Sequence, residues 1–322
     1  MLTQSLQDKV DQYETNFQML KSNLKWKVSS TQVLMAIASI YVIQNKPYKS
    51  NQLLSIQHIL KKQTGFFSPL NADHRFILAA LLDVYVQNPD EAFQRIRTIY
   101  QRMIQSGFKK DCFTYLSAFI LYKKTNDSSH HDSLIDKAMH MYQEMRNHHF
   151  FLTSTHDYPF ATMLALKETT EKNAIVIAET FYQELSKNGF KKGNDLQTMS
   201  HLLMLNGNME PTSACVKIFD ELTRLYKKPK AIHYPDIGLF TYIDEKQHDL
   251  PMIVETIEQL NAKKAFRWYK DVNVKTAFLL VMSERQGTPS MLEASISHHL
   301  HVINQATRAR NSSHANSPVT TD

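Results

Sequence analysis

Glycine and cysteine are scarce in this chain. It has seven glycines in 322 residues, whereas folds rich in left-handed turns or glycine-rich phosphate-binding loops need more. The scarcity disfavours most nucleotide-binding α/β folds and most β-sandwiches and barrels. The two cysteines, Cys112 and Cys215, lie far apart within apolar helical patterns. Such a pair is typical of reduced, buried thiols rather than of a disulfide framework, which predicts a cytoplasmic protein.

Signals for export and for membrane insertion are also missing. Residues 1–9 lack the basic and then apolar layout of a signal peptide. The longest apolar stretches, residues 33–43 and 76–86, are interrupted by Ser39 and Asp83. Both are much shorter than the ~20 residues that span a bilayer, and we therefore expect no membrane insertion.

The charge is only mildly basic. The chain has 37 Lys and Arg against 31 Asp and Glu, a net charge of +6, which is less than the dense basic face of a dedicated nucleic-acid binder. With 43% apolar and 10% aromatic residues, the chain can bury a sizeable core. We expect one helical domain over residues 1–307 without a cofactor, and a protein or a small acidic ligand rather than a nucleic acid as its partner.

Helical periodicity is present from the start of the chain. An amphipathic helix is predicted over residues 2–24, because apolar residues recur there at alternating spacings of four and three: Leu6, Val10, Tyr13, Phe17, Leu20 and Leu24. Beyond it, glycine, proline and asparagine stop signals recur, and no segment alternates as a half-buried strand would. The sequence predicts an all-α fold of about fifteen helices. Helix pairs are expected over residues 31–285, a C-terminal helix over 289–307 and a disordered tail over 308–322.

The chain also carries an internal repeat. Its three most similar copies are Ile99-Tyr-Gln-Arg-Met, Met141-Tyr-Gln-Glu-Met and Phe181-Tyr-Gln-Glu-Leu. Six apolar anchors mark the repeat at intervals of 43, 42, 40, 37 and 38 residues: Leu60, Met103, Met145, Leu185, Leu222 and Leu260. Each interval holds two helices and two turns, which predicts about six stacked helix pairs in an α-solenoid or a compact helical array.

The helix ends of the repeat follow a capping pattern. In a Schellman cap, a left-handed residue is followed by an apolar residue that packs back on the helix. Gly107 followed by Phe108, over Met103, has this spacing. The same spacing recurs at Gly189 and Phe190 over Leu185, and at His149 and Phe150 over Met145. Helix ends are therefore expected near Gly65, Gly107, His149 and Gly189.

Four stretches of the chain carry a resemblance to a known family. They are Gly65-Phe-Phe-Ser-Pro-Leu with Arg75-Phe-Ile-Leu-Ala-Ala-Leu-Leu, His149-Phe-Phe-Leu-Thr-Ser-Thr-His-Asp-Tyr-Pro, Asn188-Gly-Phe-Lys-Lys-Gly-Asn-Asp-Leu-Gln-Thr-Met-Ser-His, and Tyr234-Pro-Asp-Ile-Gly-Leu-Phe. Over roughly residues 6–285 the chain resembles an uncharacterised all-helical family, a domain of unknown function from low-GC Gram-positive bacteria. The resemblance implies an all-helical fold and brings no reaction, cofactor or catalytic residue with it.

Two polar segments are candidates for a ligand site. They contribute His156 and Asp157 before one apolar run, and Asn194, Gln197 and His201 on one predicted helix. Because they open the second helices of successive repeats, we expect them to lie close together and to form a polar concavity. The alternative is structural: such groups also cap helices and satisfy the backbone ends of neighbouring helices.

Lysine pairs follow the first helix of several repeats. The pairs are Lys61-Lys62, Lys109-Lys110, Lys191-Lys192, Lys227-Lys228 and Lys263-Lys264. In register, they would form a basic stripe for an acidic protein, a phosphate-bearing ligand or RNA. They would equally complement the helix dipoles, and aromatic residues for base stacking do not accompany every pair.

These patterns favour a non-enzymatic binding or scaffold protein. The second hypothesis is an enzyme with a polar site near Asp157 and His201, for example a metal-dependent hydrolase. However, the sequence lacks a His-Glu-x-x-His motif, a Cys-x-x-Cys motif and a pair of Glu-x-x-His motifs of the di-iron type, so no metal ligand is assigned. The third hypothesis is a weak RNA binder that uses the lysine stripe.

Overall fold

The computed structural model describes residues 2–65, 68–125, 128–206, 211–243, 249–285 and 296. Within these ranges the chain forms fourteen α-helices and three short 3₁₀ helices, and no strand. The all-α prediction is confirmed. Apart from Ile296, which is helical and buried, the expected C-terminal helix at 289–307 and the tail at 308–322 lie outside the described residues.

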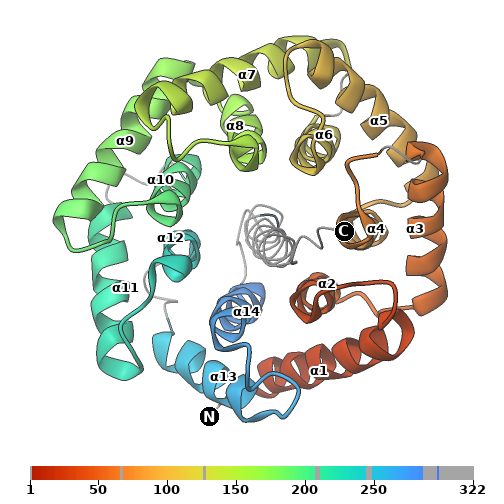
Figure 1. The fold of residues 1–322 in the computed structure, drawn as a ribbon. Helices are drawn as coiled ribbons and strands as arrows, with labels where there is room; N and C mark the ends of the chain where they lie inside the picture. Colours follow the sequence, from red (N-terminus) through yellow and green to blue (C-terminus); the bar gives the residue numbers. More distant parts are fainter. Residues whose placement is uncertain are drawn as a thin grey trace, which may run out of the picture.

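The helices form two concentric rings, and the chain alternates between them (Figure 1). The outer helices are α1 (Gln4–Leu24), α3 (Ser50–Thr64), α5 (Pro89–Gln105), α7 (His131–His148), α9 (Glu171–Lys187), α11 (Pro211–Leu225) and α13 (Leu250–Ala262). The inner helices are α2 (Thr31–Ile43), α4 (Ala72–Tyr85), α6 (Cys112–Lys124), α8 (Tyr158–Ala165), α10 (Asn194–Asn206), α12 (Tyr234–Phe240) and α14 (Lys270–Ser283). The 3₁₀ helices are η1 (Ser128–His130), η2 (Thr155–Asp157) and η3 (Ala231–His233).

Composition separates the inner helices from the outer ones. In α2 every residue from Val33 to Ile43 is buried, and α8 is buried along its whole length. The outer helix α5, by contrast, buries one stripe that includes Phe93, Ile96 and Met103 and exposes the rest. A helix that is apolar all round is stable only inside the fold, whereas an amphipathic helix lies at the surface.

The last helix pair packs against the first and closes the ring (Figure 1). The ring of Phe266, just after α13, lies 5.0 Å from the rings of both Tyr13 and Phe17 in α1. In the same region Lys9 Nζ lies 2.7 Å from Glu284 Oε1. The helix at the start of the chain is therefore the first outer helix, and the described helices make seven pairs rather than about six. Closure also removes the two exposed end faces that an open array must cover.

Two of the three expected caps have Schellman geometry. Gly107 has a φ of 99°, and the N–H of Phe108 donates to the Met103 carbonyl at 3.0 Å. Gly189 has a φ of 90°, and the N–H of Phe190 donates to the carbonyl of Leu185 at 3.1 Å. The helix end expected near Gly65 is also present, since α3 ends at Thr64.

The third expected cap is wrong. His149 ends α7 with a φ of −134°, because a residue with a Cβ avoids the left-handed region that glycine enters freely. Phe150 consequently does not pack over Met145; it is 59% exposed, and the guanidinium of Arg146 lies 4.6 Å from its ring centroid. The His149 side chain turns toward the neighbouring helix pair instead.

Candidate functional site

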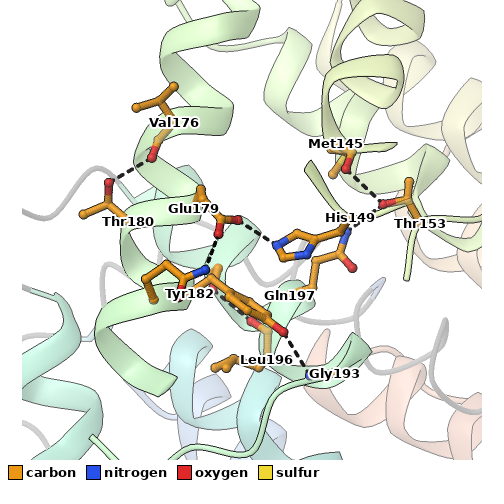
Figure 2. A network of polar contacts seen from close by, with 12 residues as sticks. Met145, His149, Thr153, Val176, Glu179, Thr180, Tyr182, Gly193, Leu196 and Gln197 are labelled. Atoms are coloured by element: carbon orange, nitrogen blue, oxygen red, sulfur yellow. Dashed lines mark hydrogen bonds and ion pairs between the residues drawn. The ribbon is translucent and has the colours of Figure 1, made fainter. Parts of the chain in front are cut away.

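His149 stands at the centre of a polar cluster between α7, α9 and α10 (Figure 2). Its Nε2 lies 2.7 Å from Glu179 Oε2, and its ring lies 4.5 Å from the ring of Tyr182. The hydroxyl of Tyr182 accepts the N–H of Gly193 at 3.2 Å. The cluster thus ties the end of α7 to α9 and to the start of α10.

A hydrogen-bond chain joins the two polar segments that the sequence singled out. Gln197 Nε2 donates to Thr153 Oγ1 at 2.9 Å, and Thr153 Oγ1 donates to the Met145 carbonyl at 3.2 Å (Figure 2). The Met145 carbonyl also accepts the N–H of His149 at 3.0 Å, so the chain adds a second hydrogen bond at the C-terminal end of α7. This arrangement supports the structural interpretation of Gln197, in which it secures a helix end.

His201 is buried beside this chain. Desolvation, together with the charge of nearby His149, lowers the pKa of His201 to about 3. His149, Gln197, Ser200 and His201 border a cavity of about 10 Å³, and a cavity of this size holds one water molecule at most. A space of this size leaves no room for a substrate.

Asp157 and His156 are engaged in a helix start. Asp157 Oδ2 accepts the N–H of Ser154 at 2.9 Å in a capping box, and burial raises the pKa of the Asp157 carboxyl to about 7. The His156 ring packs against Phe113, with centroids 4.4 Å apart. Asn194 is exposed at the first position of α10. Within the described ranges, no group of three His, Cys, Asp or Glu residues is arranged to hold a metal.

The lysine pairs lie at one end of the ring. Each connection after an outer helix leads into the start of an inner helix and lies beside the start of the next one, as the bonds from Lys109 N–H to the Tyr158 hydroxyl and from Lys191 N–H to the Tyr234 hydroxyl show. These connections therefore lie at the same end of the ring. We call this the basic end, formed by residues 25–30, 65, 68–71, 106–111, 149–157, 188–193, 226–233 and 263–269. These connections carry twelve basic residues against two acidic ones, Asp111 and Asp157. The basic residues are Lys25, Lys27, Lys109, Lys110, Lys191, Lys192, Lys227, Lys228, Lys230, Lys263, Lys264 and Arg267.

The opposite end of the ring is nearly balanced in charge. Among the described residues of the connections that lead from inner to outer helices, three are basic and two are acidic. They are Lys46, Lys49, Lys167, Glu168 and Asp249. The net charge of +6 therefore conceals a strong segregation of charge along the axis of the ring.

The basic end also exposes large aromatic side chains. Trp26 is 90%, Phe151 95% and Trp268 78% exposed. A cation accompanies both tryptophans: Lys25 Nζ and the Arg267 guanidinium each lie 5.0 Å from the neighbouring indole. These aromatic residues were not predicted from the sequence, although Trp26 lies between two lysines, Lys25 and Lys27, and this pattern could have indicated the surface.

Comparison with known proteins places this chain in a family. Residues 16–309 match the family described as protein of unknown function, DUF4003. The chain belongs to this family. It is also 36% identical over 313 residues to the uncharacterized protein YeaA of Bacillus subtilis (strain 168), covering 96% of this chain and 94% of that protein. The expected resemblance is thereby confirmed.

The comparisons add no reaction and no partner. No solved structure matches the chain. In the described part of the chain, every helix is too short or too polar to cross a bilayer. A functional proposal must therefore rest on the surface chemistry of this chain.

Proposed function

We propose that this protein is a non-enzymatic binding protein whose basic end attaches to the surface of an anionic lipid bilayer. The observation that carries the proposal is the segregation of charge, with twelve basic and two acidic residues in the connections at this end. The expected partner thus changes from a protein or small acidic ligand to a membrane surface. This attachment needs no membrane-spanning segment.

Most of the basic side chains are available for an anionic surface. Lys230 is paired with Asp271 and Lys263 with Glu14. The other ten make no ion pair with any described residue. A lysine or arginine close to an anionic bilayer contributes roughly 1 kcal/mol, so even half of the ten would give substantial attraction.

The exposed aromatic residues favour lipid over a simple polyanion. Tryptophan is enriched at membrane interfaces, where an apolar ring with a polar edge sits at the level of the headgroups. Trp26 and Trp268 have this exposure, and each has a cation beside its ring. Phe150 and Phe151 add a second pair of exposed rings at the same end.

The placement of these rings supports flat attachment. Trp26 and Trp268 follow α1 and α13, whereas Phe150 and Phe151 follow α7. Figure 1 shows α7 across the ring from α1 and α13. Aromatic contacts on both sides of the ring would hold its axis roughly perpendicular to the bilayer. An RNA platform, in contrast, needs successive rings along one basic groove.

Vesicle sedimentation tests the proposal. The intact protein is expected to sediment with vesicles of equal parts phosphatidylglycerol and phosphatidylcholine, to remain in solution with pure phosphatidylcholine, and to be released by high salt. The double variant K109E/K110E should weaken binding at least tenfold. Replacing both Trp26 and Trp268 by alanine should weaken it and leave the salt dependence unchanged.

The charge control lies at the opposite end of the ring. The double variant K49E/K167E makes the same change of charge on exposed residues and should bind like the wild type. Equal weakening by both double variants would show that only net charge matters and would reject the basic end as the surface. Binding of poly(U) RNA at salt concentrations that prevent vesicle binding would identify RNA, and not lipid, as the partner.

A further inference from the structure

An aromatic residue fills the junction between two neighbouring helix pairs at a fixed position of the repeat. The N–H of Phe190 donates to the Leu185 carbonyl, and the Phe190 ring lies 4.8 Å from both Phe219 in α11 and Tyr234 in α12. An equivalent cluster follows α5, where Phe108 contacts Tyr158, which contacts Tyr142. The first ring of each cluster comes five residues after the anchor of its outer helix.

Lys227 occupies this position at the junction that follows α11. Its N–H donates to the anchor carbonyl of α11 at 3.1 Å, as the N–H of Phe190 does one repeat earlier. Ile257 corresponds to Phe219, since each lies three residues before the anchor of its outer helix. Lys270 corresponds to Tyr234, since each is the first residue of its inner helix. This junction thus keeps the backbone hydrogen bond, without the left-handed residue that Gly189 supplies before Phe190, and loses all three rings.

A pocket lies where the rings are missing. Its cavity volume is about 100 Å³, against about 10 Å³ for the cavity beside His201, so it has room for more than a single water molecule. Its apolar wall comes from three helices: Leu222 of α11, Ile257 of α13, and Val274 and Phe278 of α14. All four side chains are buried, so the pocket offers a preformed apolar surface.

The mouth of the pocket is basic. Lys227, Lys228, Lys230 and Lys270 line it together with one carboxylate, Asp271. Lys230 Nζ lies 2.9 Å from both carboxylate oxygens of Asp271. Contact with His233 lowers the pKa of Asp271 more than burial raises it, and Lys230 lowers it further. The carboxylate is therefore neutralised within the wall, and three lysines remain to face an incoming group.

His233 supplies a buried polar atom in the same wall. The residue is 6% exposed, and its Nε2 lies 3.5 Å from Asp271 Oδ1 without a well-directed hydrogen bond to any described residue. His233 is thus held against the carboxylate of Asp271 and forms part of the pocket wall.

We propose that this pocket binds a small anion whose apolar body takes the place of the missing aromatic ring. Its phosphate or carboxylate head would contact Lys227, Lys228 and Lys270. A charged head on an apolar body is the chemistry that matches three ammonium groups above a buried aliphatic and aromatic wall. A lipid headgroup and a soluble phosphate or carboxylate share this chemistry. The site does not depend on the proposed attachment to membranes.

The fluorescent probe 8-anilinonaphthalene-1-sulfonate tests this site, because it combines an aromatic body with one anionic group. The intact protein should bind it at a saturable site from which phenyl phosphate displaces it. Inorganic phosphate and benzyl alcohol, which each carry half of this chemistry, should displace it at least tenfold less well. Stronger displacement by dihexanoyl phosphatidic acid than by phenyl phosphate would assign a lipid as the source; weaker displacement would assign a soluble anion.

Restoring the missing ring should close the pocket. Lys227→Phe is expected to weaken probe binding at least tenfold while the melting temperature stays the same or rises. Lys191→Phe makes the same substitution beside a junction that Phe190 already fills, and it should leave probe binding unchanged. If Lys227→Phe proves poorly folded, Ile257→Tyr restores the second ring and should have the same effect.

Three results would overturn the assignment. The first is that folded Lys227→Phe and Ile257→Tyr bind the probe as tightly as the wild type. The second is that Lys191→Phe and Lys227→Phe lose equal amounts of probe affinity. The third is that inorganic phosphate displaces the probe as effectively as phenyl phosphate does. Lys227→Phe removes one of the twelve basic residues at the basic end, so its vesicle binding should remain within about fivefold of wild type. Loss of the pocket can thereby be distinguished from loss of membrane attachment.

Discussion

The junctions at Phe190 and Lys227 share one backbone hydrogen bond and differ in which side chains lie beside it. In both, the N–H of the fifth residue after the anchor donates to the anchor carbonyl, at 3.1 Å. Phe190 then completes an aromatic cluster with Phe219 and Tyr234, whereas Lys227 borders a pocket. The same hydrogen bond is therefore compatible with both arrangements, and the side chains decide whether the junction is closed or open.

Truncating the closed junction should have the largest effect. Phe190 is buried among aromatic rings, so Phe190→Ala is expected to lower the free energy of unfolding by about 3–5 kcal/mol. Lys227→Ala removes an exposed side chain and should change it by less than about 0.5 kcal/mol. Urea unfolding of both variants measures the contrast. Similar losses in the two variants would show that the junctions are not distinguished by their side chains.

The His149 junction is a third case, because polar groups fill it. Its buried neighbour His201 has a pKa lowered to about 3 from 6.5, so the stability it contributes is present above pH 6.5 and is lost as pH falls toward 3. Asp157, immediately before α8, has a pKa raised from 3.8 to about 7. Its contribution has the opposite sign: it is present below pH 3.8 and is lost as pH rises through 7.

Variants that each remove one of these two groups should show opposite pH dependences of the free energy of unfolding. Between pH 4.5 and 6, Asp157→Asn should become more stable with rising pH, and His201→Gln less stable, each by at most about 1.4 kcal/mol per pH unit. Asparagine keeps an acceptor for the Ser154 N–H, which makes it a conservative choice. Urea unfolding at several pH values measures the slopes. Slopes of the same sign in the two variants would contradict the burial of one or the other group.

The cap that precedes the closed junction should have an intermediate effect. Gly189 has a φ of 90°, and a β-branched residue is strained there. Gly189→Val should therefore lower the free energy of unfolding by about 1–3 kcal/mol. Asn45 offers a contrast, since it has a φ of 50° without being glycine, and Asn45→Gly should be neutral or slightly stabilising. A melt of Gly189→Val that overlays the wild type would reject the cap.

Filling the open junction should have the smallest effect on stability. Lys227→Phe places a ring against Leu222 and Ile257 and should raise the free energy of unfolding by about 0.5–1 kcal/mol. The same variant is the one expected to lose the probe. Thermal melting in the absence of probe separates the two effects. A loss of more than about 1 kcal/mol would mean that the pocket cannot accept a ring in this place.

The two polar segments proposed as a ligand site lie against each other. Gln197 contacts Thr153, so the segments that contain Asp157 and His201 do meet. The sequence could not show that the space between His201 and its neighbours would be as small as about 10 Å³, because cavity size depends on how three helices pack. For the same reason it did not reveal that Phe150 would be exposed once His149 turned inward.

Local periodicity and capping determined the all-α fold, the helix ends at Gly107 and Gly189, and the buried stripe of the first helix. These features depend on residues within a few positions of each other. Only the tertiary structure decided that Phe266 meets Phe17 and closes the ring, that the lysines gather at one end, and that Lys227 borders a pocket. Those features arise between residues far apart in the chain, whose proximity depends on how the helix pairs stack.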